Sequence, residues 1–429
     1  MNLSGWDFFS AVSVPMLNAA LAENAARLVS DFKFKQDGIE IEGRFGPWRI
    51  VRGGSVQKLY VALPVVSGSI RGVVRRKRTD LAGMELLVEI GLRMLPEAGG
   101  AEGHKLVFDI GQEDGANGGL AHAIDLTVPQ GRLTHMQIAV VKEALTDCLN
   151  AHAEQVAFVF AHIKTRGAPE AAWLHLPHHD WANLETQDGP HFLALFGSRA
   201  KPSAAMAPTR VDPALVKGDA SAYFAVSNDL YMAAQVLPWL NANFRPKAPF
   251  AKKGAVVHLA KKVKLAKAGG YQPVLEGLSF KIAKGGLAIS AQARIDLNFL
   301  GTDLMVTTDL LMPFFLDAKT GRVGLRRDPK PRQKHWVEGS GLVGKIVAAF
   351  ISLFLPLFRG LIENTVNGFA HAMQGANNPM AQPIAWTATR DFKPSRAEVR
   401  DCLWMADDRP APVTVSPQTI QKEPDHVGL

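Results

Sequence analysis

The chain has 429 residues, of which 47% are hydrophobic and 21% charged, and its formal net charge is +8. This composition is that of a soluble globular protein. The length excludes a single ordinary core and fits two domains of about 200 residues.

The first half of the chain predicts a helix followed by antiparallel strands. The helix is expected after Ser13, which can serve as its N-cap, with Pro15 tolerated in the first turn. Alternating apolar residues then predict strands at residues 39–41, 59–65, 106–110 and 124–128. A T-x-x-Q capping box at Thr134 begins a second helix, and residues 156–164 return to a strand pattern. Residues 197–218, rich in Pro, Ala and Ser, are predicted to be a linker.

The second half repeats this order. Ser227 is expected to cap a helix that is apolar on one face as far as Leu240. Long alternating strands are predicted at residues 257–265, 287–299 and 304–310. A polar stretch over residues 321–340 then precedes an apolar helix over residues 342–373.

One part of that helix resembles a membrane span. Residues 346–358 are apolar except for Ser352 and contain Pro356. A span needs roughly 20 residues, and shorter apolar stretches are more often buried helices. We interpret the segment as buried core.

The two halves share a repeated corner. Ala11-Val12-Ser13 recurs 214 positions later as Ala225-Val226-Ser227. We therefore predict an α+β fold of two tandem modules, residues 1–205 and 206–429, with strands that can be exchanged between them. In each module a long helix is wrapped by a strongly curved antiparallel sheet. The apolar helix faces are predicted to include Leu17, Leu21, Leu28, Ile346, Phe350, Leu353, Phe354 and Leu357.

The cations are concentrated in two clusters. Between Leu230 and Leu275 there is no Asp or Glu, and the cations found there equal the whole formal excess: Arg245, Lys247, Lys252, Lys253, Lys261, Lys262, Lys264 and Lys267. The second cluster is Arg75, Arg76, Lys77 and Arg78. Such clusters suit contacts with phosphate or anionic lipid, and a solvated surface is the alternative.

Several short motifs resemble those of a known family. They are Gly5-Trp6-Asp7, Ala11-Val12-Ser13, Asn18-Ala19-Ala20-Leu21, Phe45-Gly46-Pro47-Trp48, Leu63-Pro64-Val65-Val66-Ser67-Gly68, Ser227 to Leu240 and Ile384 to Leu403. In these motifs the chain is similar to the bacterial TULIP-type (tubular lipid-binding) proteins encoded beside clostridial neurotoxins, the OrfX proteins and their 47-kilodalton companion. The similarity spans most of the chain, and the length matches the 47-kilodalton member.

The resemblance implies TULIP-like modules, which in this superfamily often enclose a lipid chain. It also implies an accessory role near toxin genes rather than catalysis, and it brings no catalytic residue. Trp6 and Trp48 are expected to be packing anchors. The Ala- and Arg-rich composition departs from that of an AT-rich clostridial source, so the resemblance does not imply a neurotoxin neighbour for this chain.

Two motifs that could carry chemistry lack the context they need. Residues 339–344 match G-x-G-x-x-G, but Ile346 stands where a phosphate loop needs Ser or Thr, and no βαβ unit surrounds them. Zinc needs three or four convergent ligands, and the cluster of His175, His178 and His179 fits no such site. We therefore expect a protein that is not an enzyme and has no cofactor or metal.

The leading hypothesis is a non-catalytic accessory protein that binds lipid, phospholipid or an anionic membrane surface, associated with a toxin system. The alternative is a protein-interaction scaffold or chaperone of a secreted toxin, with a fully packed core and no lipid, whose partner is that toxin or a neighbouring TULIP-family protein. Nucleic acid is not expected, because the lysines have few aromatic neighbours beyond Phe250 and Tyr271.

The sequence also carries expectations about compartment. Cys148 and Cys402 lie far apart and suggest reduced thiols in a cytoplasmic protein. No basic region followed by an apolar run and a cleavage site begins the chain, so no signal peptide is expected. Export by a route that needs no signal peptide stays open.

Overall fold

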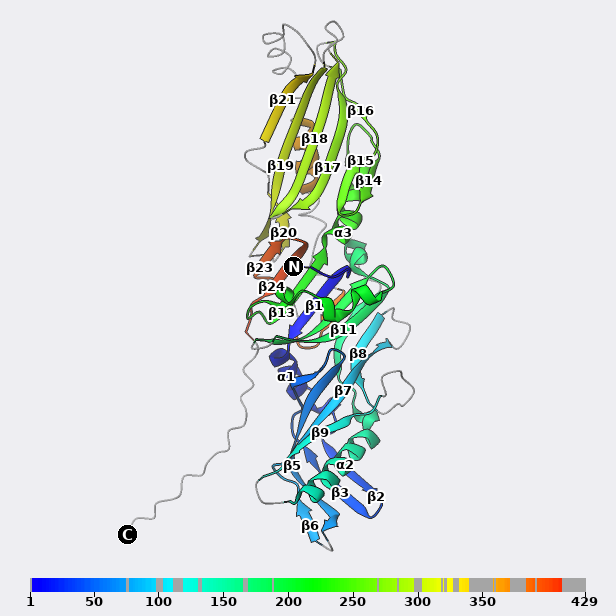
Figure 1. Ribbon diagram of the computed structural model, residues 1–429, viewed down its shortest axis with the longest axis vertical. Helices are drawn as coiled ribbons and strands as arrows, with labels where there is room; N and C mark the ends of the chain where they lie inside the picture. Colours follow the sequence, from blue (N-terminus) through cyan, green and yellow to red (C-terminus); the bar gives the residue numbers. More distant parts are fainter. Residues whose placement is uncertain are drawn as a thin grey trace, which may run out of the picture.

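The computed structural model describes residues 2–74, 77–97, 103–110, 119–129, 133–164, 169–186, 189–267, 270–283, 285–296, 303–317, 319, 322–326, 332–338, 358, 360–370, 383–389 and 392–410. The molecule is elongated, and three antiparallel sheets follow one another along its long axis (Figure 1). We call them the N-terminal sheet, of ten strands, the central sheet, of six, and the C-terminal sheet, of eight. The predicted α+β fold, with curved antiparallel sheets packed on helices, is confirmed.

The N-terminal sheet occupies one end of the molecule. Its strands are β2 (Asp31–Gln36), β3 (Ile39–Phe45), β4 (Arg49–Ser55), β5 (Lys58–Val74), β6 (Lys77–Asp80), β7 (Glu85–Pro96), β8 (Gly103–Asp109), β9 (His122–Thr127), β10 (Val159–Lys164) and β22 (Ile384–Trp386). Helix α2 (His135–Ala151) lies across it and buries Val141, Leu145 and Leu149. The close approach of β3 and β5 depends on glycine, because a Cβ at Gly43 would lie 2.8 Å from the Gly68 Cα.

The C-terminal sheet forms the other end. Its strands are β14 (Phe250–Lys253), β15 (Val256–Leu259), β16 (Val263–Lys264), β17 (Val274–Ala283), β18 (Gly286–Asp296), β19 (Asp303–Asp317), β20 (Arg322–Leu325) and β21 (Arg332–Glu338). Two helical segments accompany it. One runs through α3 (Asn228–Tyr231), a π-helical turn (Met232–Val236) and α4 (Leu237–Asn243), and the other includes residues 358 and 360–370.

Three details of this end differ from the sequence prediction. The strand expected over residues 257–265 is divided into β15 and β16. The polar stretch 321–340 contains β20 and β21, which pair with successive parts of β19. β17 was not anticipated. Of the predicted apolar helix, residues 358 and 360–370 are described, and they are helical.

The central sheet combines strands from both halves of the chain. Its order is β11 (His178–Glu185), β12 (His191–Ser198), β1 (Phe8–Ser13), β13 (Ala222–Ser227), β24 (Cys402–Asp407) and β23 (Arg396–Val399). The repeated strands β1 and β13 are antiparallel neighbours, with Ala11 opposite Tyr223. The Ser13 N–H donates to the Ser221 carbonyl, and the Ser227 N–H donates to the Asp7 carbonyl, both at 2.8 Å. The repeat is therefore arranged around a local two-fold axis between β1 and β13.

A strand from the end of the chain also joins the first half. β22 pairs with β10 at the edge of the N-terminal sheet, with Ala161 opposite Trp386. The indole Nε1 of Trp386 donates to Ser10 Oγ at 2.9 Å in a buried environment. The division of the chain between residues 205 and 206 stays a prediction.

The segment predicted to be a linker is packed against the protein, which corrects that interpretation. Gly197 and Ser198 belong to β12, and the 3-10 turns that follow cover the central sheet. Leu215 and Val216 are buried there, and the Trp404 indole donates to the Leu215 carbonyl at 2.8 Å. The Pro- and Ala-rich composition indicated irregular backbone but not this apolar contact.

Both predicted anchor tryptophans are buried. Trp6 and Trp48 are each 1% exposed, and the Trp48 indole donates to the Val29 carbonyl at 3.2 Å. No helix that the structure describes has the length and apolar character needed to cross a bilayer.

Two of the three residues predicted to cap a helix do so through their side chains. Thr134 and Gln137 form both bonds of the capping box, and Ser227 Oγ accepts from the Leu230 N–H at 3.1 Å. Ser13 stands at the N-cap of α1 (Val14–Glu23), but its hydroxyl does not cap the helix, contrary to expectation.

We expect Thr134→Ala to lower the free energy of unfolding by about 1 kcal/mol, because the Gln137 N–H loses its acceptor. Chemical denaturation monitored by circular dichroism measures this loss. Thr134→Ser, which keeps the hydroxyl, is the matched control and should stay close to wild type. Equal losses in the two variants would show that the cap does not stabilise α2.

Candidate functional site

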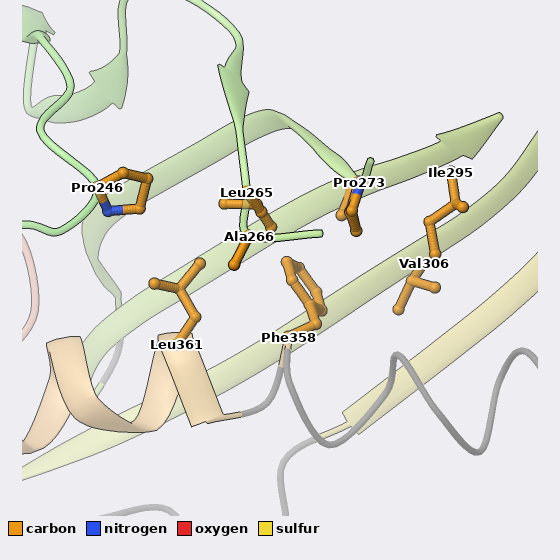
Figure 2. Close-up of a pocket in the computed structure, with 9 residues that line it drawn as sticks. Pro246, Leu265, Ala266, Pro273, Ile295, Val306, Phe358 and Leu361 are labelled. Atoms are coloured by element: carbon orange, nitrogen blue, oxygen red, sulfur yellow. The ribbon is translucent and has the colours of Figure 1, made fainter. Parts of the chain in front are cut away.

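An apolar cavity of about 180 Å³ lies between the C-terminal sheet and the helix that includes residues 360–370 (Figure 2). Every residue that lines it is apolar: Pro246, Leu265, Ala266, Pro273, Ala293, Ile295, Val306, Phe358 and Leu361. Phe358 and Leu361 come from the helix, and Ile295 and Val306 from the sheet facing it.

The alternation along β18 accounts for the sheet side of the cavity. Leu287, Ile289, Ala291, Ala293 and Ile295 are all buried on one face, as the period of two predicts. Ala293 pairs with Val306 on β19, and both have short side chains. Because small residues lie opposite the helix here, space is left that larger residues would fill.

Cations flank the residues that line this cavity. Pro246 is preceded by Arg245 and followed by Lys247, while Leu265 and Ala266 stand between Lys264 and Lys267. All four cations are exposed. The Arg245 guanidinium donates to the Ala242 and Phe244 carbonyls at 3.0 and 2.9 Å, which fixes this cation at the end of α4. The site thus combines an apolar interior with a basic edge.

Two of the predicted cations form ion pairs with carboxylates, although the stretch of sequence that contains them has no Asp or Glu. Lys252 forms an ion pair with Asp229, and Lys262 forms one with Glu276 at 2.7 Å. Burial acts to raise the pKa of Asp229, but hydrogen bonds from Lys252 and Arg199 outweigh it and hold that pKa below its ordinary value. Both acids lie just outside the acid-free stretch of sequence. The remaining two, Lys253 and Lys261, are exposed.

The second predicted cluster lies elsewhere. Lys77 and Arg78 are exposed on β6, at the end of the molecule away from the C-terminal sheet (Figure 1). Arg78 forms an ion pair with Glu42 at 3.2 Å. Arg75 and Arg76 lie outside the described residues. The structure therefore does not bring the two basic clusters together.

The comparisons with known proteins decide the family. A family profile described as "OrfX-like: Protein OrfX2/OrfX3/P47" matches residues 3–303. The chain belongs to this OrfX-like family. Over 166 residues it is 26% identical to Protein P47 of Clostridium botulinum (strain Kyoto / Type A2), a match that covers 38% of each chain.

Solved structures of two P47 proteins share the fold of this OrfX-like chain. The structure of P47 from Clostridium botulinum A2 matches with a TM-score of 0.76 at 18% identity, over 95% of this chain and 98% of that one. The crystal structure of P47 of Clostridium botulinum E1 matches with a TM-score of 0.71 at 16% identity, over 94% and 99%. The predicted resemblance to the 47-kilodalton member is thereby confirmed.

The predicted apolar helix residues are divided between described and undescribed parts of the chain. Leu17 and Leu21 are buried on α1. Leu28 is buried too, but it follows the 3-10 turn Ala25–Arg27, so it is not on the helix. Ile346, Phe350, Leu353, Phe354 and Leu357 lie outside the described residues, as does the glycine motif at 339–344.

Sequence reasoning missed most of the cavity. Pro246, Pro273 and Phe358 were not singled out, and Ala293 and Ile295 were recognised only as strand residues. One signal was available, because apolar residues stand directly between cations at both 245–247 and 264–267.

The three clustered histidines lie at the entry to β11, with His175 directly after the 3-10 turn Pro169–Leu174. His178 and His179 begin β11, and the His179 ring lies 6.3 Å from that of His104 on β8. Burial, helped by His104 and His178, lowers the pKa of His179 to about 4. Within the residues described, no three His, Cys, Asp or Glu side chains gather as a metal site would need.

Burial raises the pKa of Cys148 and of Cys402 to about 12, so both thiols stay protonated.

Proposed function

We propose that this OrfX-like protein is a non-catalytic binder of anionic amphiphiles. The hydrocarbon part of the ligand enters the apolar cavity, while Arg245, Lys247, Lys264 and Lys267 bind its head group or the surrounding anionic membrane surface. The observation that carries this proposal is that cations flank an apolar cavity on two separate segments of the chain.

The size of the cavity limits what it can hold. An apolar cavity of about 150 Å³ stays dry and binds benzene, so a hydrocarbon segment of about six carbons is the appropriate scale here. At about 0.8 kcal/mol per buried methylene, that segment contributes about 5 kcal/mol. Alone this corresponds to a dissociation constant of about 0.2 mM. Each cation near an anionic surface adds about 1 kcal/mol, so the basic edge is needed for tight binding.

Membership of the OrfX-like family supports an accessory role in a toxin system rather than a catalytic role. The competing function is a scaffold for a protein partner, for which the cavity would be only a packing defect. The two functions differ in one respect that can be measured. Only the first requires the cavity and the basic edge to act on the same ligand.

The first test uses vesicles. We expect the protein to bind vesicles that contain phosphatidylglycerol better than vesicles of phosphatidylcholine alone, and salt to weaken the binding. The double variant Lys264→Glu/Lys267→Glu should bind the anionic vesicles at least tenfold more weakly in co-sedimentation. Lys33→Glu/Lys35→Glu, on exposed positions of β2, makes the same change in net charge and is the matched control. Equal losses in both variants would show that only net charge matters.

The second test concerns the cavity itself. Ala293→Trp should fill the cavity and reduce the binding of a fluorescent fatty acid at least tenfold, while vesicle binding through the cations is partly kept. Lipid extraction of the purified protein followed by mass spectrometry should find an acyl lipid in wild type and less in Ala293→Trp. If no lipid is extracted and the fatty acid binds both proteins equally, the scaffold function is favoured.

A further inference from the structure

A second, larger cleft lies where the central sheet meets α1 and β4. Its volume is about 610 Å³, within the range of small-molecule sites. Ser13 and Val14 line it at the start of α1, together with Ile50, Arg52, His191 and Asp219. The cleft is distinct from the apolar cavity, since the two share no lining residue.

The local two-fold axis provides an internal comparison for this cleft. Ser13 and Ser227 are related by the repeat, and each precedes a helix. At Ser227 the helix start is occupied by a carboxylate, because Ser227 Oγ donates to Asp7 Oδ1 at 3.4 Å. Asp7 is 7% exposed and is held by the Arg199 guanidinium, with Nη2 to Oδ1 at 2.9 Å. One of the two related helix starts thus already contains a buried anion.

The other helix start has a neutral residue at the position of Asp7. The position related to Asp7 is Ser221, whose hydroxyl is directed to the Asp407 carbonyl at 3.1 Å. Ser13 is only 6% exposed, and its hydroxyl forms no hydrogen bond with any residue that the structure describes. The first turn of α1 contains no acidic residue. The cleft therefore lies at a helix start where a carboxylate stands in the related copy.

The remaining polar groups of the cleft define its polarity. Arg52 is held at the rim by donating from Nη1 to the Gly189 carbonyl at 2.7 Å and from Nη2 to the Thr186 carbonyl. His191 is 6% exposed and bonds to Asn183 through Nε2. Asp219 is exposed, lines the cleft two residues from Ser221, and opposes an anion with its negative charge. Pro15, in the first turn of α1, has no N–H to offer. The helix dipole and the remaining free N–H groups still attract anions, so an anionic group is best placed beside Ser13.

We propose that this cleft binds a small ligand that carries a carboxylate or phosphate group, with the oxyanion beside Ser13 at the start of α1. The Ser13 hydroxyl donates to the oxyanion, the helix end stabilises its charge, and Arg52 contributes positive potential from the rim. The ligand takes the place that Asp7 occupies in the related copy.

The test places a side-chain carboxylate where the oxyanion of the ligand is proposed to bind. Ser13→Asp puts a carboxylate at the position of the proposed anion and keeps a residue that is favoured at N-caps. Ser13→Asn is nearly the same in shape and also favoured there, but it is neutral. Isothermal titration with citrate and, separately, with inorganic phosphate distinguishes the two kinds of oxyanion. We expect at least one of them to bind wild type and Ser13→Asp to weaken that binding at least tenfold. Ser13→Asn, which loses the hydroxyl but adds no negative charge, should weaken it clearly less than Ser13→Asp does.

Two results would overturn this proposal. One is the absence of binding by either probe at 10 mM, and the other is an equal effect of the Asp and Asn variants. Thermal unfolding of both variants reports whether they fold, and a melting temperature for Ser13→Asp at or above that of wild type is the expected result. Ala293→Trp should leave binding of the probes unchanged, which separates this cleft from the apolar cavity.

Discussion

Replacing Trp386 by alanine is expected to lower the free energy of unfolding by about 4 kcal/mol. Trp386 is 4% exposed and lies on β22, which pairs with β10 at the edge of the N-terminal sheet. Removing its ring leaves a cavity that usually costs about 3–5 kcal/mol for a buried aromatic residue. The variant also removes the buried partner of the Ser10 hydroxyl. Urea denaturation followed by circular dichroism measures the change.

Trp386→Phe separates the two contributions. It keeps most of the apolar ring but has no N–H for Ser10, so a loss of about 1–2 kcal/mol is expected. Trp239→Ala is a second control, because this ring is only partly buried and packs on Phe369. It should lower the free energy of unfolding less than Trp386→Ala does. If Trp386→Ala lost less than 1 kcal/mol, β22 would not hold the end of the chain to the first half.

Acid is expected to destabilise the protein between pH 6.5 and pH 4, and His179 should account for about 3 kcal/mol of the loss. The pKa of His179 falls to about 4 in the folded protein because of burial, against about 6.5 in the unfolded chain. Above pH 6.5 the residue is neutral in both states and has no effect on stability. As the pH falls, the unfolded chain binds a proton that the folded protein does not, so unfolding becomes more favourable.

His179→Gln tests this directly, because glutamine does not titrate. Unfolding free energies measured from pH 7.5 to pH 4 should decline less steeply in this variant than in wild type. A part of the decline should remain, since burial also lowers the pKa of His191 to about 4. His122→Gln, at an exposed position of β9, is the control and should follow the wild-type curve. Identical curves for all three proteins would contradict the prediction.

The parts of the fold that sequence predicts are those set by local patterns. The capping box at Thr134 and the alternation along β18 each depend on residues close together in the chain, and both are present. β20 and β21 lie in what the sequence shows only as a polar stretch, because their pairing partner, β19, and not their own pattern, makes them strands. The packing of Leu215 under Trp404 was missed for the same reason, since the two lie 189 positions apart.

The candidate site shows the same division between local and distant information. The exposed cations at 245–247 and 264–267 were identified, because charge is visible in sequence. The pairing of Lys262 with Glu276 depends on the antiparallel pairing of β16 with β17, which the pattern did not reveal. The cavity depends on the spacing between the helix at 360–370 and strands β18 and β19. The alternation of residues along a single strand gives no information on that spacing. The cleft at Ser13 became visible only through comparison with Ser227 in three dimensions.

The pairing of β22 with β10 has a consequence for how the chain is made on the ribosome. When residues 1–205 have emerged, β10 still presents an open sheet edge, and β1 lacks its neighbour β13. Open edges of this kind are sites at which nascent chains associate wrongly. The first half can complete its sheet only when residues 384–386 have left the exit tunnel. Translation as far as β22 must therefore precede the final folding of the first half, and a truncated product that stops before β22 should be a target for chaperones and proteases.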